Sequence, residues 1–260
     1  MATLKVIDVS QWNGVITWPT VAKNVDAVII RAGYRGYGSA GTLATDPKFK
    51  TNIQGAIAAK IPVGVYWCSQ ALSDAEAIEE ANYCADLLRG LKIQYPVYLD
   101  SEHMGPNASG RADKISKARR TQYGITFCRA MKDHGYTAGL YCSESWYYDA
   151  IDGAAFDKAG FEIWIAKYSS SKPKYACDAW QYSDKGKIPG ITGYTDMNHF
   201  YKDYANATAD PIDVTLQNAI KDIGLNSPDL WSDILRGKKT ASAANIKSLM
   251  DKYHAAVVAK

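Results

Sequence analysis

Short apolar segments rich in β-branched and aromatic residues recur along the first 205 residues of the chain, with helical stretches between several of them. Each has the length of one buried strand, and strands that alternate with helices are typical of parallel β/α units. Eight such segments are enough to close a barrel. We expect strands at Leu4–Val9, Asp26–Ala32, Pro62–Trp67, Pro96–Ser101, Thr137–Tyr141, Glu162–Ala166, Asp178–Gln181 and near Tyr194–Met197. The sequence therefore predicts an α/β fold built on a TIM-like barrel.

Helical patterns separate the earlier strands but become scarce toward the end of the barrel. We predict helices at Asp46–Lys60, Asp74–Arg89 and Ala112–His134. The second opens with several acidic residues, which suits the positive end of a helix dipole. The last third of the barrel region has strands but few long helices, so we expect the barrel to be irregular.

The composition changes after Tyr204. Residues 206–213 are polar and contain Pro211, and three helical patterns follow. We therefore predict three regions: a barrel at residues 1–205, a linker at 206–213 and a small three-helix module at 214–260. Such a module is too small to be very stable alone. We expect it to pack on the barrel or to pair with a second copy of itself.

Charge and composition exclude several classes of function. The net charge is only +3, whereas nucleic-acid-binding proteins usually carry a dense basic face. The chain has 18 Tyr and 7 Trp but only 5 Phe. Tyr and Trp join a flat apolar body to a polar edge, which suits both a protein core and a surface that stacks on sugar rings.

The cysteines and the N-terminus bear on the compartment. Five Cys without a CxxC pair indicate neither a disulfide framework nor a zinc ribbon. We interpret them as reduced thiols in the core, consistent with synthesis in a reducing cytoplasm. The first residues lack the charged and apolar regions of a signal peptide, and no apolar run reaches the length of a membrane span. We expect neither secretion by a signal peptide nor membrane insertion.

Two carboxylates end one predicted strand, in Tyr95-Pro-Val-Tyr-Leu-Asp-Ser-Glu102. Residues i and i+2 of a strand point to one face, so Asp100 and Glu102 project together. Each disfavours ionisation of the other, so one pKa should rise. That suits a site where one carboxylic acid donates a proton and another stays ionised. A solvated strand end remains the alternative for this motif taken alone.

Two more acids occupy similar positions. Asp8 ends the first predicted strand, and Asp196 lies on the last. The first and last strands of a closed barrel are neighbours, so these acids should lie together across the mouth from Asp100 and Glu102. Asp8 alone is also explained as a helix cap, but four convergent acids indicate a catalytic site.

Aromatic residues with polar neighbours recur at the other strand ends. They are Tyr66-Trp67, Tyr141, Trp164-Ile-Ala-Lys-Tyr168 and Trp180-Gln181-Tyr182. Each alone is explained by core packing. As a set beside the acids, they indicate a groove lined for stacking on sugars.

Eight segments together resemble the glycoside hydrolase family 25 muramidases, the Chalaropsis-type lysozymes, which include many phage endolysins. In family order they are Asp8-Val-Ser-Gln-Trp-Asn-Gly14, Ile30-Arg-Ala-Gly-Tyr34, Gly64-Val-Tyr-Trp67, Tyr98-Leu-Asp-Ser-Glu102, Gly139-Leu-Tyr141, Trp164-Ile-Ala-Lys-Tyr168, Trp180-Gln-Tyr182 and Asp196. The resemblance implies an irregular, flattened β/α barrel. It also implies cleavage of the β-1,4 bond between N-acetylmuramic acid and N-acetylglucosamine in peptidoglycan, with retention at the anomeric carbon.

The resemblance also assigns roles to residues. Glu102 matches the general acid/base, Asp100 the second carboxylate, and Asp8 and Asp196 supporting acids. Asp100 either attacks the sugar or orients the substrate's own 2-acetamido group, and both routes retain configuration. Substrate binding is expected from Arg31, Tyr66, Trp67, Tyr141, Trp164, Lys167 and Gln181. The family needs no metal, and we expect no cofactor.

The expected enzyme is therefore a lysozyme that acts on bacterial peptidoglycan. We expect a phage endolysin, made in the host cytoplasm and released to the wall by another route; a bacterial autolysin is the alternative origin. Alternative functions are a hydrolase of another amino-sugar polymer, such as chitin, and a non-catalytic wall-binding protein. Residues 214–260 show no recognisable wall-binding repeat. They are interpreted either as a wall-binding module or as a packing element that forms a homo-oligomer.

Overall fold

Eight strands form the centre of the protein. The computed structural model describes residues 3–104, 107 and 109–205, together with residues 242, 246, 247 and 251. The barrel strands are β1 (Leu4–Val9), β2 (Ala27–Arg35), β4 (Val63–Cys68), β5 (Val97–Asp100), β6 (Ala138–Ser143), β7 (Glu162–Ala166), β8 (Ala179–Gly186) and β9 (Thr195–Phe200). All eight strands predicted from the sequence are confirmed, with ends that differ by a few residues.

The strands close into a ring. Their order is β1-β9-β8-β7-β6-β5-β4-β2, and β2 pairs again with β1. Seven strands of the ring, β1, β2 and β4 to β8, run parallel, whereas β9 is antiparallel to both of its neighbours. Residues 187–194 connect β8 directly back to β9 without a helix, and such a connection reverses the chain. A short extra strand, β3 (Leu43–Thr45), pairs with β2 outside the ring.

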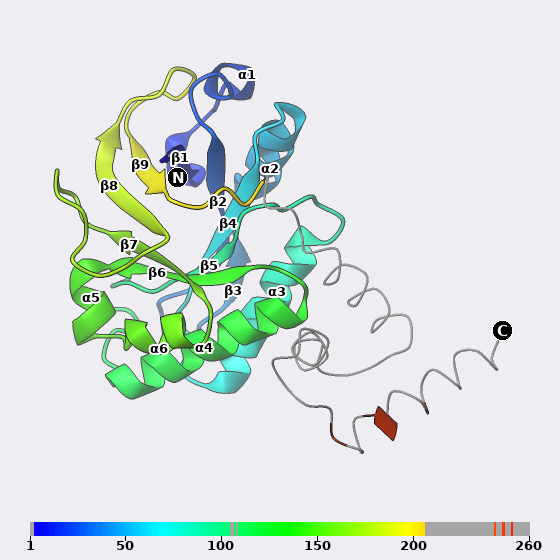
Figure 1. Ribbon diagram of the computed structural model, residues 1–260, viewed down its shortest axis with the longest axis vertical. Coiled ribbons are helices and arrows are strands. Elements are labelled where there is room, and N and C mark those ends of the chain that lie inside the picture. Colours follow the sequence, from blue (N-terminus) through cyan, green and yellow to red (C-terminus); the bar gives the residue numbers. More distant parts are fainter. Residues whose placement is uncertain are drawn as a thin grey trace. The chain divides into compact units, whose positions relative to one another are not determined.

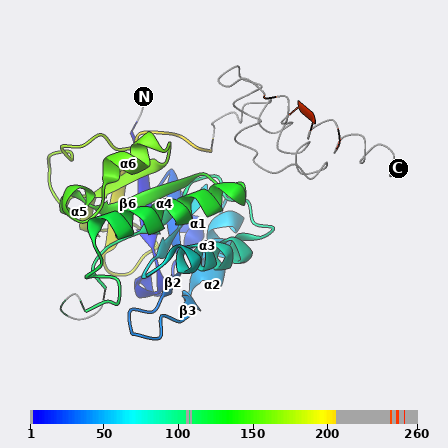
Figure 2. The ribbon, with the colours of Figure 1, turned by 90° about the horizontal axis from the view of Figure 1, so that it is seen from below.

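Helices cover the outside of the barrel unevenly (Figures 1 and 2). They are α1 (Trp18–Val21), α2 (Phe49–Ala58), α3 (Asp74–Leu88), α4 (Lys117–Asp133), α5 (Glu144–Asp149) and α6 (Gly153–Lys158). The helix predicted to open at Asp74 does so, with the Ser73 hydroxyl as its cap. Helix α4 begins five residues later than Ala112, because Ser116 caps it. The β7–β8 and β8–β9 connections, both fully described, contain no helix, which confirms the irregular barrel.

The core has two layers because strand residues alternate between the two faces. Inward-pointing Tyr98, Trp164 and Phe200 fill the barrel. Outward-pointing Val, Ile and Leu side chains pack under α2, α3 and α4. All five Cys are free and four of them are buried, as the sequence predicted.

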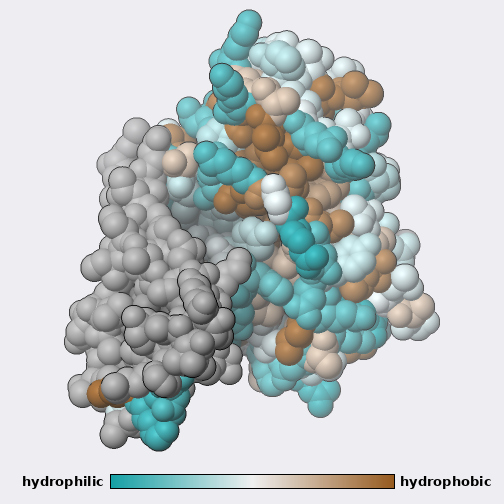
Figure 3. Space-filling view, turned by 90° about the vertical axis from the view of Figure 1, so that its right-hand side faces the viewer, coloured by the Kyte–Doolittle hydropathy of each residue, from teal (hydrophilic) through white to brown (hydrophobic). Residues whose placement is uncertain are grey.

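The outer surface in Figure 3 mixes hydrophilic residues with an apolar area in its upper half. No helix in the described part of the chain combines the length and apolar character that a membrane crossing requires. The chain divides into one unit up to Ala205 and another from Asn206. The linker predicted at 206–213 and the module predicted at 214–260 fall outside the described residues, apart from residues 242, 246, 247 and 251.

Candidate active site

A pocket of about 150 Å³ opens at the carboxyl end of the parallel strands. Four carboxyl groups, four aromatic rings and one amide line it. They are Asp8, Asp100, Glu102, Asp196, Tyr66, Tyr141, Trp164, Tyr168 and Gln181. This is the end of a β/α barrel at which active sites form.

Strand alternation and barrel closure bring the four acids together. Asp8 on β1 lies directly opposite Asp196 on β9, so the two side chains share a face. Asp100 is the last residue of β5, and Glu102 follows two residues later. Ser101, between them, points to the other side, where it lines a separate cavity against α4. The arrangement expected from the sequence is confirmed.

Two amides hold the Asp8 carboxylate. Gln181 Nε2 and Asn198 Nδ2 both donate to Asp8 Oδ2, at 2.9 and 2.8 Å. Asp8 is only 5% exposed. Burial raises the pKa of Asp8 to about 6, against the effect of the two hydrogen bonds. A single oxygen therefore takes both amide donors, which fixes the plane of the carboxyl group.

Aromatic side chains orient these amides in turn. The Tyr141 and Tyr168 hydroxyls donate to Gln181 Oε1, at 2.7 and 3.1 Å. The Trp164 indole N–H donates to Asn198 Oδ1, at 2.9 Å. Each amide oxygen is thus engaged by an aromatic donor, so each amide nitrogen faces Asp8. The network specifies one orientation for both amides.

Asp100 lies deepest among the acids and has few partners. The Cys68 thiol donates to its Oδ2 at 3.0 Å, and its Oδ1 has no hydrogen-bond partner among the described residues. Burial raises the pKa of Asp100 well above the usual range, and the Glu102 carboxylate adds to this rise. The Cys68 hydrogen bond and the Arg31 guanidinium oppose it. Asp100 thus lines the pocket with one carboxyl oxygen held by Cys68 and the other buried without a partner.

Glu102 stands at the mouth. The residue is exposed, but its carboxyl group lines the pocket. Partial desolvation there raises the pKa of Glu102 to about 6, with Asp196 adding to the rise and Arg31 opposing it. Burial, followed by the charges of Asp8 and Asp184, raises the pKa of Asp196 to about 8. Arg31 is held in place by Asp46, with an N–O distance of 2.7 Å.

Near neutral pH this cluster holds protons that isolated carboxylates would lose. One member can then donate a proton while another remains negatively charged, which is the requirement for acid catalysis beside a nucleophile or charge stabiliser. The surrounding rings offer flat apolar surfaces against which a sugar can pack. Together these features suit a glycosidase site.

A search against protein-family models matches residues 7–191 to the family described as "Glycosyl hydrolases family 25". This chain belongs to family 25. The match covers more than two thirds of the sequence and contains eight of the nine residues that line the pocket. The ninth, Asp196, lies just beyond its end.

Curated sequences and solved structures resemble this chain. A curated relative is the "Autolytic lysozyme" of Clostridium acetobutylicum, 26% identical over 200 residues, 76% of this chain and 56% of that protein. The chain therefore spans little more than half of that relative's length. The modular autolysin LytC from Streptococcus pneumoniae, solved with a synthetic peptidoglycan ligand, matches with a TM-score of 0.67 at 24% identity over 76% of this chain and 47% of that one. The catalytic domain of endolysin ply40 from Listeria monocytogenes bacteriophage P40 matches with a TM-score of 0.63 at 22% identity over 79% and 96%.

Two of the predicted substrate-binding residues lie outside the pocket. Trp67 is fully buried on the outer face of the barrel, against Tyr83 of α3. Its neighbour Tyr66 takes the inward position, because successive strand residues alternate. Lys167 likewise points away, with its ammonium group near Glu144 at 3.3 Å. Neither residue lines the family 25 pocket.

The remaining predicted residues gather at the site. Tyr66, Tyr141, Trp164 and Gln181 line the pocket, as do all four acids. Arg31 does not line it but acts on two of the acids through its charge. Among the residues that the structure describes, no group of three or more His, Cys, Asp or Glu side chains could hold a metal ion.

Tyr168, which the sequence places in the aromatic groove, lines the pocket. Sequence reasoning does not find two residues of the site: Asn198, which holds Asp8, and Cys68, which holds Asp100. The alternation rule points to both, because they lie two residues from the inward-pointing Asp196 and Tyr66. The sequence alone favours a core thiol at Cys68, because buried cysteines usually act as small core residues.

Proposed function

We propose that this chain is a lysozyme that hydrolyses the β-1,4 bond between N-acetylmuramic acid and N-acetylglucosamine in peptidoglycan. The observation that carries the proposal is the convergence of Asp8, Asp100, Glu102 and Asp196 in one aromatic-lined pocket of a family 25 barrel. The names of the relatives, an autolytic lysozyme and an autolysin solved with a peptidoglycan ligand, support the substrate.

In this proposal Glu102 is the general acid. It stands at the mouth, where a glycosidic oxygen can approach, and its pKa of about 6 keeps part of the population protonated near neutral pH. After the bond breaks, the same carboxylate activates the incoming water. Asp100 supports the positive charge that develops at the anomeric carbon, through its free Oδ1.

Retention follows from either of two roles for Asp100. It attacks the anomeric carbon and forms a glycosyl-enzyme, or it orients the 2-acetamido group of the substrate for that attack. Asp8 and Asp196 complete the negative pocket around the positively charged transition state. Mass spectrometry of denatured enzyme trapped with a slow substrate separates the routes, because only the first adds a sugar mass to the protein.

The decisive experiment compares Glu102→Gln with the wild-type protein on purified peptidoglycan. Loss of the acid should lower kcat by about 10²–10⁴-fold, while binding and fold persist because Gln is nearly isosteric. Glu144→Gln is a matched control, because that glutamate pairs with Lys167 outside the pocket. Full activity in Glu102→Gln would refute the assignment.

Product analysis tests the bond. New reducing ends on N-acetylmuramic acid support a muramidase, whereas ends on N-acetylglucosamine or freed peptides would indicate another enzyme. Cleavage of chitin but not peptidoglycan would favour a different amino-sugar polymer. Binding without cleavage would favour a wall-binding protein.

The biological setting is a separate part of the proposal. We propose a phage endolysin that reaches the wall with the help of a second protein, supported by the likeness to the ply40 catalytic domain. Expression in a bacterial cytoplasm should then leave cells intact until a pore-forming protein is also produced. Lysis on expression of this chain alone would contradict the dependence on a second protein.

A further inference from the structure

Exposed large apolar side chains are concentrated at the end of the barrel that bears the pocket. The described residues include nine of them, and six lie outside the α-helices in connections that follow a parallel strand or precede the antiparallel β9. These six are Trp12, Val15, Tyr37, Leu72, Tyr168 and Tyr194. Because those segments meet at the carboxyl end of the barrel, this end carries six of the nine exposed large apolar side chains in the described part of the chain.

Trp12 is the most unusual member of the group. It is 80% exposed and is the one exposed tryptophan in the described part of the chain. It lies in a short 3₁₀ turn, Gln11–Asn13, directly after β1, so it is four residues beyond Asp8. A tryptophan that contributes nothing to the core leaves a large apolar area in water, and such exposed area commonly marks a binding surface.

Tyr194 lies beside this turn, although it is far away in the sequence. Asn13 Nδ2 donates to the Tyr194 carbonyl oxygen at 3.4 Å, and Ile16 bridges to Ile191. Tyr194 is 59% exposed and precedes Asp196 by two residues. The turn after β1 and the segment before β9 thus place two exposed rings on the rim next to Asp8 and Asp196.

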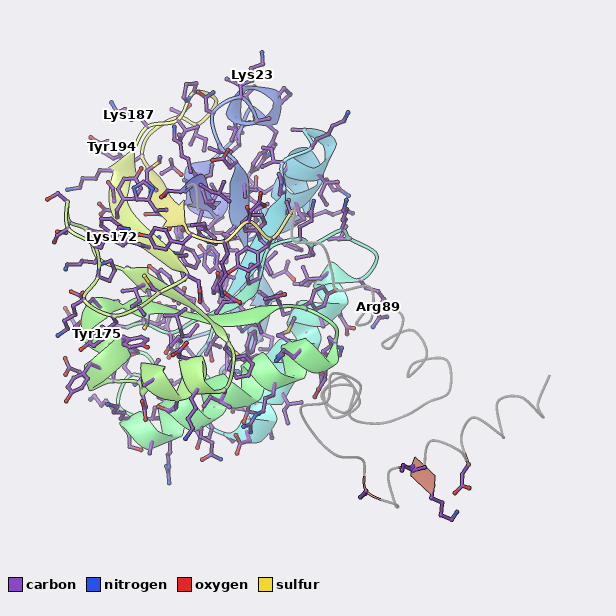
Figure 4. All side chains as sticks on the ribbon, viewed as in Figure 1. Lys23, Arg89, Lys172, Tyr175, Lys187 and Tyr194 are labelled. Atoms are coloured by element: carbon purple, nitrogen blue, oxygen red, sulfur yellow. The ribbon has the colours of Figure 1, made fainter. Side chains whose placement is uncertain are left out.

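A lysine side chain lies beside the Tyr194 ring. Lys187 Nζ lies 5.7 Å from the centroid of the Tyr194 ring, and both side chains lie at the β8–β9 connection in Figure 4. Flat rings favour the apolar face of a sugar, and a lysine favours a carboxylate. The chemistry of this rim therefore matches an acidic amino-sugar polymer.

We propose that Trp12 and Tyr194, with Lys187 beside them, form a sugar-binding subsite outside the acidic pocket, which binds a further N-acetylhexosamine unit of the strand being cleaved. The proposal rests on the proposed lysozyme function. The occupant follows from continuity: the rim borders the pocket on the Asp8–Asp196 side, so a polymer held across the pocket extends over it.

The test uses the full chain carrying Glu102→Gln, which binds without turnover. Calorimetry measures its affinity for a soluble octasaccharide of alternating N-acetylglucosamine and N-acetylmuramic acid. Adding Trp12→Ala and Tyr194→Ala together should weaken binding about tenfold, because two stacked rings are lost. The melting temperature should not change, because both side chains are exposed.

Tyr148→Ala is the matched control. Tyr148 is a similarly exposed tyrosine, but it lies on α5 and stacks on Tyr175 rather than on this rim. The Glu102→Gln protein with Tyr148→Ala added should bind the octasaccharide with the same affinity as the Glu102→Gln protein. In otherwise wild-type protein, the double substitution should raise KM for the octasaccharide about tenfold and change kcat less than twofold.

The outcomes separate the two proposals. Unchanged affinity in the double variant, or an equal loss in Tyr148→Ala, would overturn the subsite while wild-type cleavage of peptidoglycan upholds the lysozyme. Weakened binding by the double variant without any cleavage by the wild-type protein would support the subsite and overturn the lysozyme. Failure of the Glu102→Gln protein to bind the octasaccharide would overturn both the subsite and the lysozyme proposal.

Discussion

At the scale of single residues, the contact between Cys68 and Asp100 has a measurable consequence. A thiol is a weak donor, and its hydrogen bond to Asp100 Oδ2 opposes the rise that burial causes in the pKa of Asp100. Cys68→Ser supplies a stronger donor and should lower the pKa of Asp100. Cys68→Ala leaves the buried oxygen without its donor and should raise that pKa. The acid limb of the kcat/KM profile should therefore move to lower pH in the first variant and to higher pH in the second.

A role for Cys68 in filling space alone predicts a different result. Both substitutions would then change the melting temperature and leave the acid limb where it is in the wild-type protein. Cys142→Ser is a suitable control. Cys142 is also buried, on β6 next to the strand that carries Asp100, but it makes no hydrogen bond to Asp100. Its acid limb should match that of the wild-type protein.

Asp196 predicts how stability depends on pH. Its pKa is about 8 in the folded protein, whereas an unfolded Asp has a pKa of about 4. The folded state therefore binds this proton more tightly, and the free energy of unfolding falls as pH rises from about 4 to about 8. Asp196→Asn removes the penalty, so it should raise the melting temperature by about 2–4 °C at about pH 8.5.

The same substitution provides its own control. At about pH 4 Asp196 is protonated in the folded protein and about half protonated in the unfolded chain, so most of the penalty is absent and the variant and the wild-type protein should melt at nearly the same temperature. Activity should fall at both values, because the carboxyl group is lost from the pocket. A stabilisation that is equal at both pH values would show that the charge of Asp196 is not its cause.

The sequence was sufficient for the acids and insufficient for some of their neighbours. Barrel closure and the i, i+2 rule placed all four carboxyl groups correctly. The residue types of Trp67 and Lys167 suit sugar binding, but Tyr66 and Tyr168 beside them are the residues that line the pocket. The hydrogen bonds that join Asp8 to Asn198, 190 residues away, depend on a register that local patterns do not reveal.

At the scale of elements, helix α3 and the loop after β2 both contact the loop that follows β5, which also carries Glu102. Arg111 makes a paired contact with Glu76 of α3, at 2.9 and 3.0 Å, and its backbone N–H donates to the Tyr37 carbonyl. Gly41 lies against this arginine with φ at +55°, where a Cβ would come within 2.1 Å of Arg111 Nη1. A Cβ at position 41 would therefore force the Arg111 guanidinium to move, and the positive φ disfavours any residue other than glycine there.

Gly41→Ala should break this brace. The positive φ and the contact with Arg111 together should lower the free energy of unfolding by about 2 kcal/mol, measured by urea denaturation. We also expect kcat to fall, because the loop that follows β5 loses its support. Gly38→Ala is the control in the same loop, since nothing lies within 4 Å of its Cβ position. Similar effects of both substitutions would argue against the brace.

Element prediction succeeded where apolar pattern and caps agreed. Helix α3 begins at Asp74 as expected, because Ser73 and the acids after it mark its start. The direction of β9 could not be read in the same way, since an apolar run is equally compatible with parallel and antiparallel pairing. Strand β3 is three residues long and carries too little pattern to be recognised.

At the scale of the whole molecule, the barrel is complete before the C-terminal region begins. The last strand, β9, ends at Phe200 and pairs with β1, and Tyr204 and Ala205 pack against the interior cluster. All four acids of the pocket also come before this point. Nothing that the described barrel needs for closure therefore comes from residues 210–260.

Removal of residues 210–260 should accordingly separate hydrolysis from attack on cells. We expect the shortened protein to keep the wild-type far-ultraviolet circular dichroism of the barrel and to cleave soluble peptidoglycan fragments with kcat/KM within about threefold of the full chain. If the removed region binds the wall, lysis of whole cells should fall by about tenfold or more, because tethering raises the effective substrate concentration. Equal lysis of cells by both proteins would favour a packing or pairing role, which sedimentation of the full chain and the shortened chain would then detect as a change in oligomeric state.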